Sequence, residues 1–404
     1  IYNGNAWVNE GVLHESEART NLCNHSDNPA NWLSNPSGSF TFTAAQAVGS
    51  DGTLSLTKVA IGNTSTTPHE IYTTYSSINP SLGMTLSAEL KNGNQRYVML
   101  RQYIDANDWF AVTFDLVTGV VTQESVGSTG SVSIRSSGVI DLANGLYRCW
   151  VSYIGIGNTS AAGFPTIDAV PSGTPTLASN GTESYSGTVG THFYLGKMQL
   201  EQGATPSSYI PTSGSAATRA AETLTVPAAN LPYNSTNMSI QIDGKITYAD
   251  QDEFTAHQFM RWRASGSDFI SIVGGTNTGD GLRVLFQQVA GGVNDTIPTG
   301  VVYNEGILVP FNLSSRHGST FINGATDGTA LTADTTPVAL PDLSTTNLEL
   351  GYDFMGTIAQ FRMWDEDLTD AGIVEATEPS TEPSLQLTFD GSSTNSFTVL
   401  DWSE

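Results

Sequence analysis

Basic side chains are scarce in this sequence. Its 404 residues include 15 lysines and arginines against 39 aspartates and glutamates, which gives a formal net charge of −24. A surface this acidic repels phosphate backbones, so we expect no nucleic-acid partner. It also disfavours anionic polysaccharides unless cations intervene. Neutral sugars, or sugars bound through a divalent metal, remain open as ligands.

Cysteine is nearly absent as well, with only Cys23 and Cys149, far apart in the chain. A disulfide framework needs more cysteines in a smaller domain. Both residues lie in β-like runs, which favours two buried free thiols, with a single bridge as the alternative. No run of 18 or more apolar residues exists, so we expect no membrane insertion. The chain begins at Ile1 without a signal-peptide pattern, so we expect it to start partway through a longer product or after a removed segment.

Glycine, by contrast, is abundant at 40 residues, and charged residues make up only 13% of the chain. Runs such as residues 108–116 and 268–275 alternate apolar and polar side chains with period two, and turn-forming pairs separate them. This pattern is typical of half-buried antiparallel strands. The sequence therefore predicts an all-β protein built from antiparallel sandwiches or jelly rolls.

A segment rich in Ser, Thr, Ala, Gly and Pro divides the strand-rich regions. Pro206 and Pro211 block regular structure in it, and Tyr209-Ile210 is its one large apolar pair, suited to pin it to a neighbouring surface. We interpret it as an ordered strap between two tandem sandwiches. The expected division is an N-terminal arm at 1–15, a first sandwich at 16–199, the strap at 200–223, a second sandwich at 224–375 and a C-terminal tail at 376–404.

Three stretches resemble a module common in bacteriophage tail-fibre and other virion proteins: GVLHESEARTNLCNHSDNPANW, GLYRCWVSY and FYLGKMQLEQGATPSSYIPTSGSAATRAAETLTV. The likeness spans residues 11–226. In the strap, Ser207 and Ser208 stand where that module usually has Thr-Ser. The resemblance implies a virion or secreted adhesive surface protein with an extracellular location, such as a tail fibre, head fibre or capsid decoration protein.

The second half is similar to concanavalin A-like, laminin G-type jelly rolls. Asn323-Gly324 matches their hairpin pair and is expected to form a tight turn. Their "G-x-I-x-x-x-R-x-W-x-x-x-L" strand is matched by Gly356, Ile358, Arg362, Trp364 and Leu368. This motif implies the fold and topology of a concanavalin A-like domain and names no ligand.

Catalytic motifs are missing from the sequence. A retaining glycosidase needs two carboxylates about 5 Å apart, and no suitable alternating acidic stretch occurs. The nearest acidic clusters are residues 250–253 and 365–367, both in expected loops. We therefore expect no enzyme. Asp250, Asp252 and Glu253 are either a solvated loop or a cation site, for which Ca²⁺ would suit the acidic surface.

Two turns combine aromatic rings with hydrogen-bonding side chains, the combination that sugar recognition uses. In each, the alternative is that the tryptophan folds back into the core and the arginines pair with local acids. The candidate ligand-binding residues are Arg101, Tyr103, Asp105, Asp108, Trp109, Arg261, Trp262 and Arg263.

These observations predict a non-enzymatic virion surface protein, an adhesin that binds host cell-surface glycans. Such proteins are built into symmetric assemblies, so we expect contacts with other virion proteins and a homo-oligomer, with a trimer as the first guess. One alternative is a structural subunit, a capsid decoration or fibre spacer that binds only other virion proteins. The other is a polysaccharide-degrading enzyme.

Overall fold

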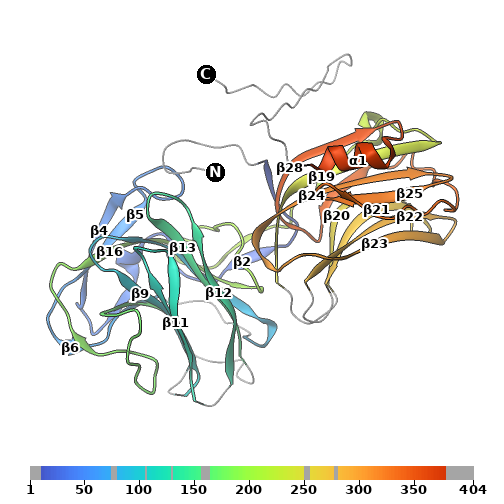
Figure 1. Ribbon diagram of the computed structural model, residues 1–404. Helices are drawn as coiled ribbons and strands as arrows, with labels where there is room; N and C mark the ends of the chain where they lie inside the picture. Colours follow the sequence, from blue (N-terminus) through green and yellow to red (C-terminus); the bar gives the residue numbers. More distant parts are fainter. Residues whose placement is uncertain are drawn as a thin grey trace.

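The computed structural model describes residues 11–73, 80–104, 107–128, 131–155, 164–249, 255–276 and 281–378. Within these stretches the chain forms two antiparallel β-sandwiches that lie beside each other (Figure 1). This confirms the predicted all-β class. No helix in the same stretches is long and apolar enough to cross a membrane.

One sheet of the first sandwich, here called the β9 sheet, carries a functional candidate on its outer face. Its strands run in the order β11 (Val120–Val126), β10 (Trp109–Asp115), β9 (Tyr97–Tyr103), β14 (Phe164–Val170), β7 (His69–Tyr72) and β3 (Leu33–Asn35). Side chains alternate between the two faces of a strand. Leu100 and Phe110 therefore enter the core between the sheets, whereas Arg101 and Trp109 point outward.

The opposing β8 sheet closes this sandwich. Its strands run in the order β12 (Val132–Asp141), β13 (Leu146–Gly155), β8 (Met84–Asn92), β16 (His192–Gln202), β5 (Leu56–Ile61) and β4 (Phe40–Ala47). The ring centroids of Phe110 and Tyr153 lie 4.5 Å apart across the core. Smaller elements complete this half: η1 (Pro29–Asn31), β6 (Thr66–Thr67), η2 (Pro80–Leu82) and β15 (Tyr185–Ser186).

Both cysteines lie in this core, as the sequence favoured. Cys23 and Cys149 are buried and unbridged. Burial raises the pKa of both thiols well above the ordinary value, because an apolar interior disfavours the charged thiolate. The two thiols therefore act as small core side chains rather than reactive groups.

The second sandwich also consists of two six-stranded sheets. The β19 sheet runs in the order β1 (Val12–Glu15), β28 (Met355–Trp364), β19 (Asn237–Tyr248), β24 (Gly306–Gly318), β25 (Ile322–Thr326) and β26 (Thr329–Ala330). The β21 sheet runs in the order β18 (Leu224–Val226), β27 (Leu348–Tyr352), β20 (Ala256–Ser265), β21 (Asp268–Thr276), β22 (Leu282–Ala290) and β23 (Val293–Tyr303). Ile240, Ile272 and Phe286 pack between them. The remaining elements are η3 (Ala228–Asn230) and α1 (Thr369–Thr377), which packs on β24 and β25.

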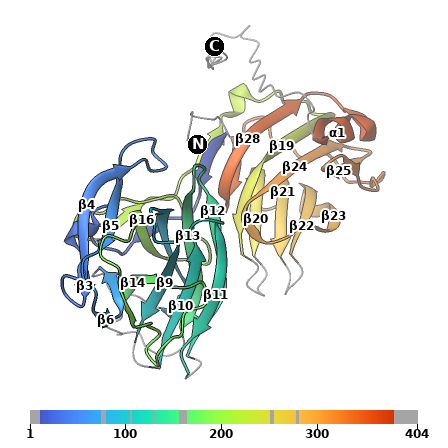
Figure 2. The ribbon, with the colours of Figure 1, turned by 60° about the vertical axis from the view of Figure 1, so that its left-hand side comes forward.

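The N-terminal arm is integrated into the second sandwich. Four of its residues form β1, which pairs with β28, and Figure 2 shows this dark blue strand beside β28. The chain then crosses to the first sandwich, where β2 (Arg19–Asn21) pairs with β17 (Ala217–Arg219) of the strap. Two segments therefore connect the sandwiches, the one after β1 and the strap.

The strap is ordered, as predicted. Its Ile210 is 5% exposed, and the hydroxyls of Tyr209 and Ser26 lie 2.6 Å apart. The side-chain amide of Asn21 donates to Ile210 O at 2.8 Å. Arg19 donates from Nη1 to Gln202 O at 2.6 Å. Polar contacts to the segment after β1 therefore hold the strap in place.

The prediction of a tight turn at Asn323-Gly324 is wrong, because both residues lie inside β25. The turn after this strand is formed by Asp327 and Gly328, whose φ angles are +45° and +79°. Gly324 is needed for packing instead, since a Cβ there would lie 2.1 Å from the ring of Phe286. The pair is thus a strand element that lets an aromatic ring approach the backbone.

Candidate ligand-binding site

A pocket of about 280 Å³ opens on the outer face of the β9 sheet, and we call it the Arg101 pocket. Strands β3, β7, β9 and β14 supply most of its lining, and the loop after β14 supplies the rest. The lining residues are Asn35, Glu70, Tyr72, Arg101, Tyr103, Phe164, Thr166, Asn180 and Thr182.

The floor of the pocket is an ion-paired cluster centred on Arg101. The strand register places Glu70 of β7 opposite Asp168 of β14, and Thr166 of β14 opposite Arg101 of β9. Arg101 donates from Nε to Asp168 Oδ2 at 3.0 Å and from Nη2 to Glu70 Oε2. These three charged side chains are only 2–6% exposed. Burial of such groups is tolerated because they are paired and hydrogen-bonded.

The floor carries more negative than positive charge. Burial raises the pKa of Asp168 to about 6, and the neighbouring Glu70 adds to this rise while Arg101 opposes it. Burial alone would lower the pKa of Arg101, but the charges of Asp168 and Glu70 outweigh it and raise that pKa. The floor therefore places one guanidinium between two carboxyl groups.

Aromatic side chains form the rim. Tyr72 and Phe164 pack with ring centroids 5.0 Å apart, and Phe164 is 36% exposed. The guanidinium carbon of Arg101 lies 5.8 Å from the ring centroid of Tyr103. The pocket thus offers partly exposed apolar rings next to buried polar groups.

Trp109 supports the pocket and does not enter it, so the expectation that it stacks on a ligand is wrong. The side chain is 6% exposed, and Nε1 donates to Ser179 O at 2.7 Å. Gly181 lies against the indole so closely that a Cβ would be 2.5 Å from a ring carbon. The loop held in this way places Asn180 O within 3.4 Å of Arg101 Nη1. The alternative considered from the sequence, a tryptophan folded back onto the protein, is correct.

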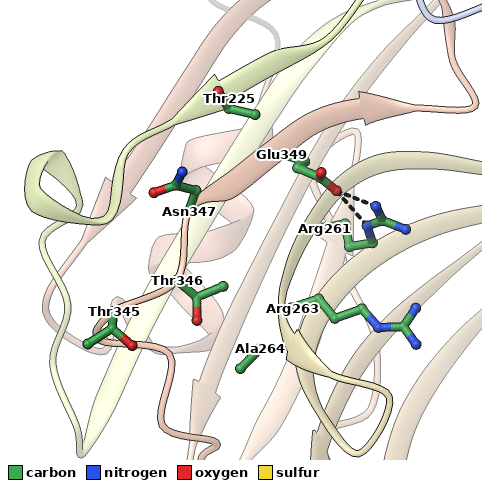
Figure 3. Close-up of a pocket in the computed structure, with 8 residues that line it drawn as sticks. All are labelled: Thr225, Arg261, Arg263, Ala264, Thr345, Thr346, Asn347 and Glu349. Carbon is green, nitrogen blue, oxygen red and sulfur yellow. Dashed lines mark hydrogen bonds and ion pairs between the residues drawn. The ribbon is translucent and has the colours of Figure 1, made fainter.

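A second pocket, of about 640 Å³, lies on the second sandwich where β20 meets the start of β27, and we call it the Arg263 pocket (Figure 3). Arg261 donates from Nε to Glu349 Oε2 at 2.7 Å, and its guanidinium carbon is 3.7 Å from the ring centroid of Tyr352. Its lining residues are Thr225, Arg261, Arg263, Ala264, Thr345, Thr346, Asn347 and Glu349.

Trp262 cannot contact a ligand in this pocket, which corrects the second stacking expectation. It is fully buried in the core, and Nε1 donates to Thr346 O at 2.7 Å. Arg263 is exposed and donates from Nε to Ser265 O at 3.1 Å. In Figure 3 the guanidinium groups of Arg261 and Arg263 extend in the same direction along the sheet. Among the described residues that line this pocket, none is aromatic.

The other predicted site residues lie elsewhere. Asp108 is in the turn before β10 and does not line the Arg101 pocket. Within the stretches that the structure describes, no group of three or more His, Cys, Asp or Glu side chains could hold a metal ion. Four of the predicted site residues lie outside the described stretches: Asp105, Asp250, Asp252 and Glu253. The possible Ca²⁺ site among the last three stays a prediction.

Sequence reasoning identified Arg101 and Tyr103 but missed most of the pocket. Glu70 and Asp168 are 31 and 67 residues away from Arg101 in the chain. The period-two alternation within a strand indicates which residues point outward. It does not say which strands pair, and only that pairing brings Glu70 and Asp168 next to Arg101. Phe164, at the start of β14, gave no local signal of a rim position.

No family model and no curated protein matches this sequence. Solved structures give partial likenesses. The CBM40 module of Ruminococcus gnavus IT-sialidase, bound to α2,3-sialyllactose, is 13% identical and has a TM-score of 0.30, covering 39% of this chain and 97% of that one. CG-16, a homodimeric agglutinin from chicken liver, is 9% identical with a TM-score of 0.24, covering 35% of this chain and 100% of that one.

A bacteriophage protein is also among the similar structures. Tailspike protein 2 of an Escherichia coli O157:H7 bacteriophage is 10% identical with a TM-score of 0.29, covering 40% of this chain and 27% of that one. These neighbours are carbohydrate-binding, lectin-like and tailspike proteins. Each likeness covers less than half of this chain at low identity, so it carries no residue roles over.

Proposed function

We propose that this protein is a non-enzymatic glycan-binding protein and that the Arg101 pocket is its saccharide site. One observation carries the proposal: a single pocket combines a buried, ion-paired guanidinium with a rim of three aromatic side chains, Tyr72, Tyr103 and Phe164. A concave site with apolar walls and a few fixed polar groups is the usual form of a small-ligand site.

The two kinds of group suit the two kinds of surface on a sugar. Aromatic rings pack against the C–H face of a pyranose. Hydroxyl groups both donate and accept, so they can donate to the carboxylate of Glu70 and accept from Arg101 and from the side-chain amide of Asn180. The polar groups of the floor are held by one another before a ligand arrives. Binding therefore costs little ordering of side chains.

Paired carboxylates can also serve a glycosidase, and that alternative is weaker here. Glu70 and Asp168 both contact Arg101, and Asp168 does not line the pocket. A nucleophile or general acid must reach the substrate. We therefore assign the pair to binding.

We place this binding activity on the surface of a bacteriophage virion, in a tail fibre, head fibre or capsid decoration protein that faces host glycans. This setting rests on the resemblance of residues 11–226 to virion modules. A homo-oligomer, with a trimer as the first expectation, would join several shallow sites and gain avidity from them. A purely structural virion subunit is the competing role.

A glycan array followed by calorimetry on the best saccharide tests the proposal. We expect Phe164→Ala to weaken binding about fivefold, because one aromatic contact contributes about 1 kcal/mol. Val293→Ala is the matched control, since it also removes an exposed apolar side chain and lines neither pocket. If the folded protein binds no saccharide, or if Phe164→Ala binds as tightly as the control, the Arg101 pocket is not a saccharide site.

A further inference from the structure

The charge of the Arg101 pocket bears on which saccharides it can accept. Arg101 contributes one positive charge, and Glu70 and Asp168 contribute two negative charges in direct contact with it. Among the described residues that line the pocket, Arg101 is the sole basic side chain. The floor therefore has a net charge of −1 when both carboxylates are ionised.

Most of the N–H groups of Arg101 already have partners within the protein. Arg101 has five N–H donors. Three already act, with Nε bonded to Asp168, Nη2 to Glu70 and Nη1 to Asn180 O. An arginine that recognises a carboxylate usually presents two parallel N–H groups to it. One N–H on each Nη atom remains for a ligand, so the guanidinium charge that a ligand meets is already paired with two carboxylates.

The position of Glu70 also favours hydroxyl groups. It lines the pocket, and its Oε1 accepts from the side-chain amide of Asn35 while its Oε2 accepts from Arg101. A carboxylate oxygen can accept more than one hydrogen bond, so it can still accept from a sugar hydroxyl. The same oxygen repels the carboxylate of an acidic sugar, and burial strengthens that repulsion.

We propose that the Arg101 pocket selects uncharged saccharides over acidic ones, and that Glu70 and Asp168 determine this specificity. The inference rests on the proposed function of the same pocket. It adds the substrate class and the reason for it: two carboxylates outnumber the one guanidinium that they hold. The net charge of −24 on the whole chain acts in the same direction at long range.

The test compares matched pairs of oligosaccharides that differ by one acidic group, such as a neutral hexose chain and its uronic-acid counterpart. Affinities are measured by calorimetry at pH 7.5. We expect the acidic member of a bound pair to bind at least about tenfold more weakly. Raising NaCl from 0.05 to 0.5 M should narrow this gap only slightly, because salt screens buried charges much less than exposed ones.

Asp168→Asn supplies a direct check, since it removes one negative charge with almost no change in shape. The readout is the ratio of the two affinities measured on the same variant: Asp168→Asn should bring the affinity for the acidic sugar closer to the affinity for the neutral sugar. Glu70→Gln is a second variant for the case in which Asp168→Asn fails to fold. Glu124→Gln is the control, because this glutamate lies on the neighbouring β11 and does not line the pocket.

Equal or tighter binding of the acidic member would overturn the inference while leaving glycan binding intact. So would a difference in affinity between the neutral and the acidic sugar that the charge-removing variants leave unchanged. Absence of binding to every saccharide, in protein shown to be folded, would remove the proposed function and the inference with it.

Discussion

Gly181 is a small residue on which the Arg101 pocket depends. It adopts a φ of +77°, which glycine tolerates and other residues rarely adopt. It also lies directly against the indole of Trp109, whose Nε1 holds the same loop through Ser179 O. Asn180 and the loop are thus positioned by a contact that only a residue without a Cβ permits.

We predict that Gly181→Ala will weaken saccharide binding and destabilise the protein by about 2–3 kcal/mol, since it combines backbone strain with a steric clash. Gly145→Ala is the matched control. Gly145 has a φ of +69°, but a Cβ there would have no atom within 4 Å. The control substitution should lower the free energy of unfolding by about 1–2 kcal/mol and leave saccharide binding unchanged. Urea unfolding and calorimetry measure the two effects, and equal binding by both variants would contradict the role given to Gly181.

At the scale of elements, β1 couples the start of the chain to the second sandwich. Besides the pairing of β1 with β28, its His14 ring donates from Nε2 to Gly351 O at 2.9 Å. Glu15 then contacts the strap, with Oε2 2.8 Å from Arg219 Nη1 and Oε1 accepting from Ser208 N at 2.8 Å. One short strand therefore holds both the second sandwich and the strap.

Removing Glu15 should loosen this junction. We expect Glu15→Ala to cost about 3 kcal/mol, because it leaves Arg219 without its buried partner. The variant should also expose the strap, residues 200–223, to protease. Glu17→Ala is the control. The Glu17 side chain is 48% exposed, and its buried partner Arg19 keeps a second ion pair with Glu201, so we expect a loss of about 1 kcal/mol or less.

Limited proteolysis with mapping of the cleavage sites follows the strap, and urea unfolding follows stability. Cleavage of Glu15→Ala at the same rate and positions as Glu17→Ala would show that β1 does not restrain the strap.

At the scale of the whole molecule, the excess of acidic groups sets a general dependence on salt. A formal charge of −24 repels itself in the compact state. We expect the melting temperature at pH 7.5 to rise by about 2–4 °C when NaCl is raised from 0.02 to 0.5 M, equivalent to about 1 kcal/mol. Calorimetric scans measure it. Near the sequence pI of about 4.3 the net charge vanishes, so the salt effect should vanish there as well. A salt effect that persists at that pH would point to another cause.

The sequence by itself determined the all-β class, because period-two alternation of apolar and polar residues is typical of strands with one buried face. The alternating runs at 108–116 and 268–275 correspond to β10 and β21 in the structure. It also indicated the ordered strap and the buried thiols. Local composition pointed to Arg101 and Tyr103, which do line the pocket.

Only the tertiary structure decided which residues meet. Glu70 and Asp168 join Arg101 because β7, β14 and β9 pair in one particular register, which no local pattern specifies. Burial likewise excludes Trp109 and Trp262 as ligand contacts. Whether an indole is exposed depends on which distant strands and loops cover it, and in this structure both are covered. Pairing and packing of distant segments are long-range properties, whereas alternation and turn chemistry are local, and this is why the fold class could be predicted and the floor of the pocket could not.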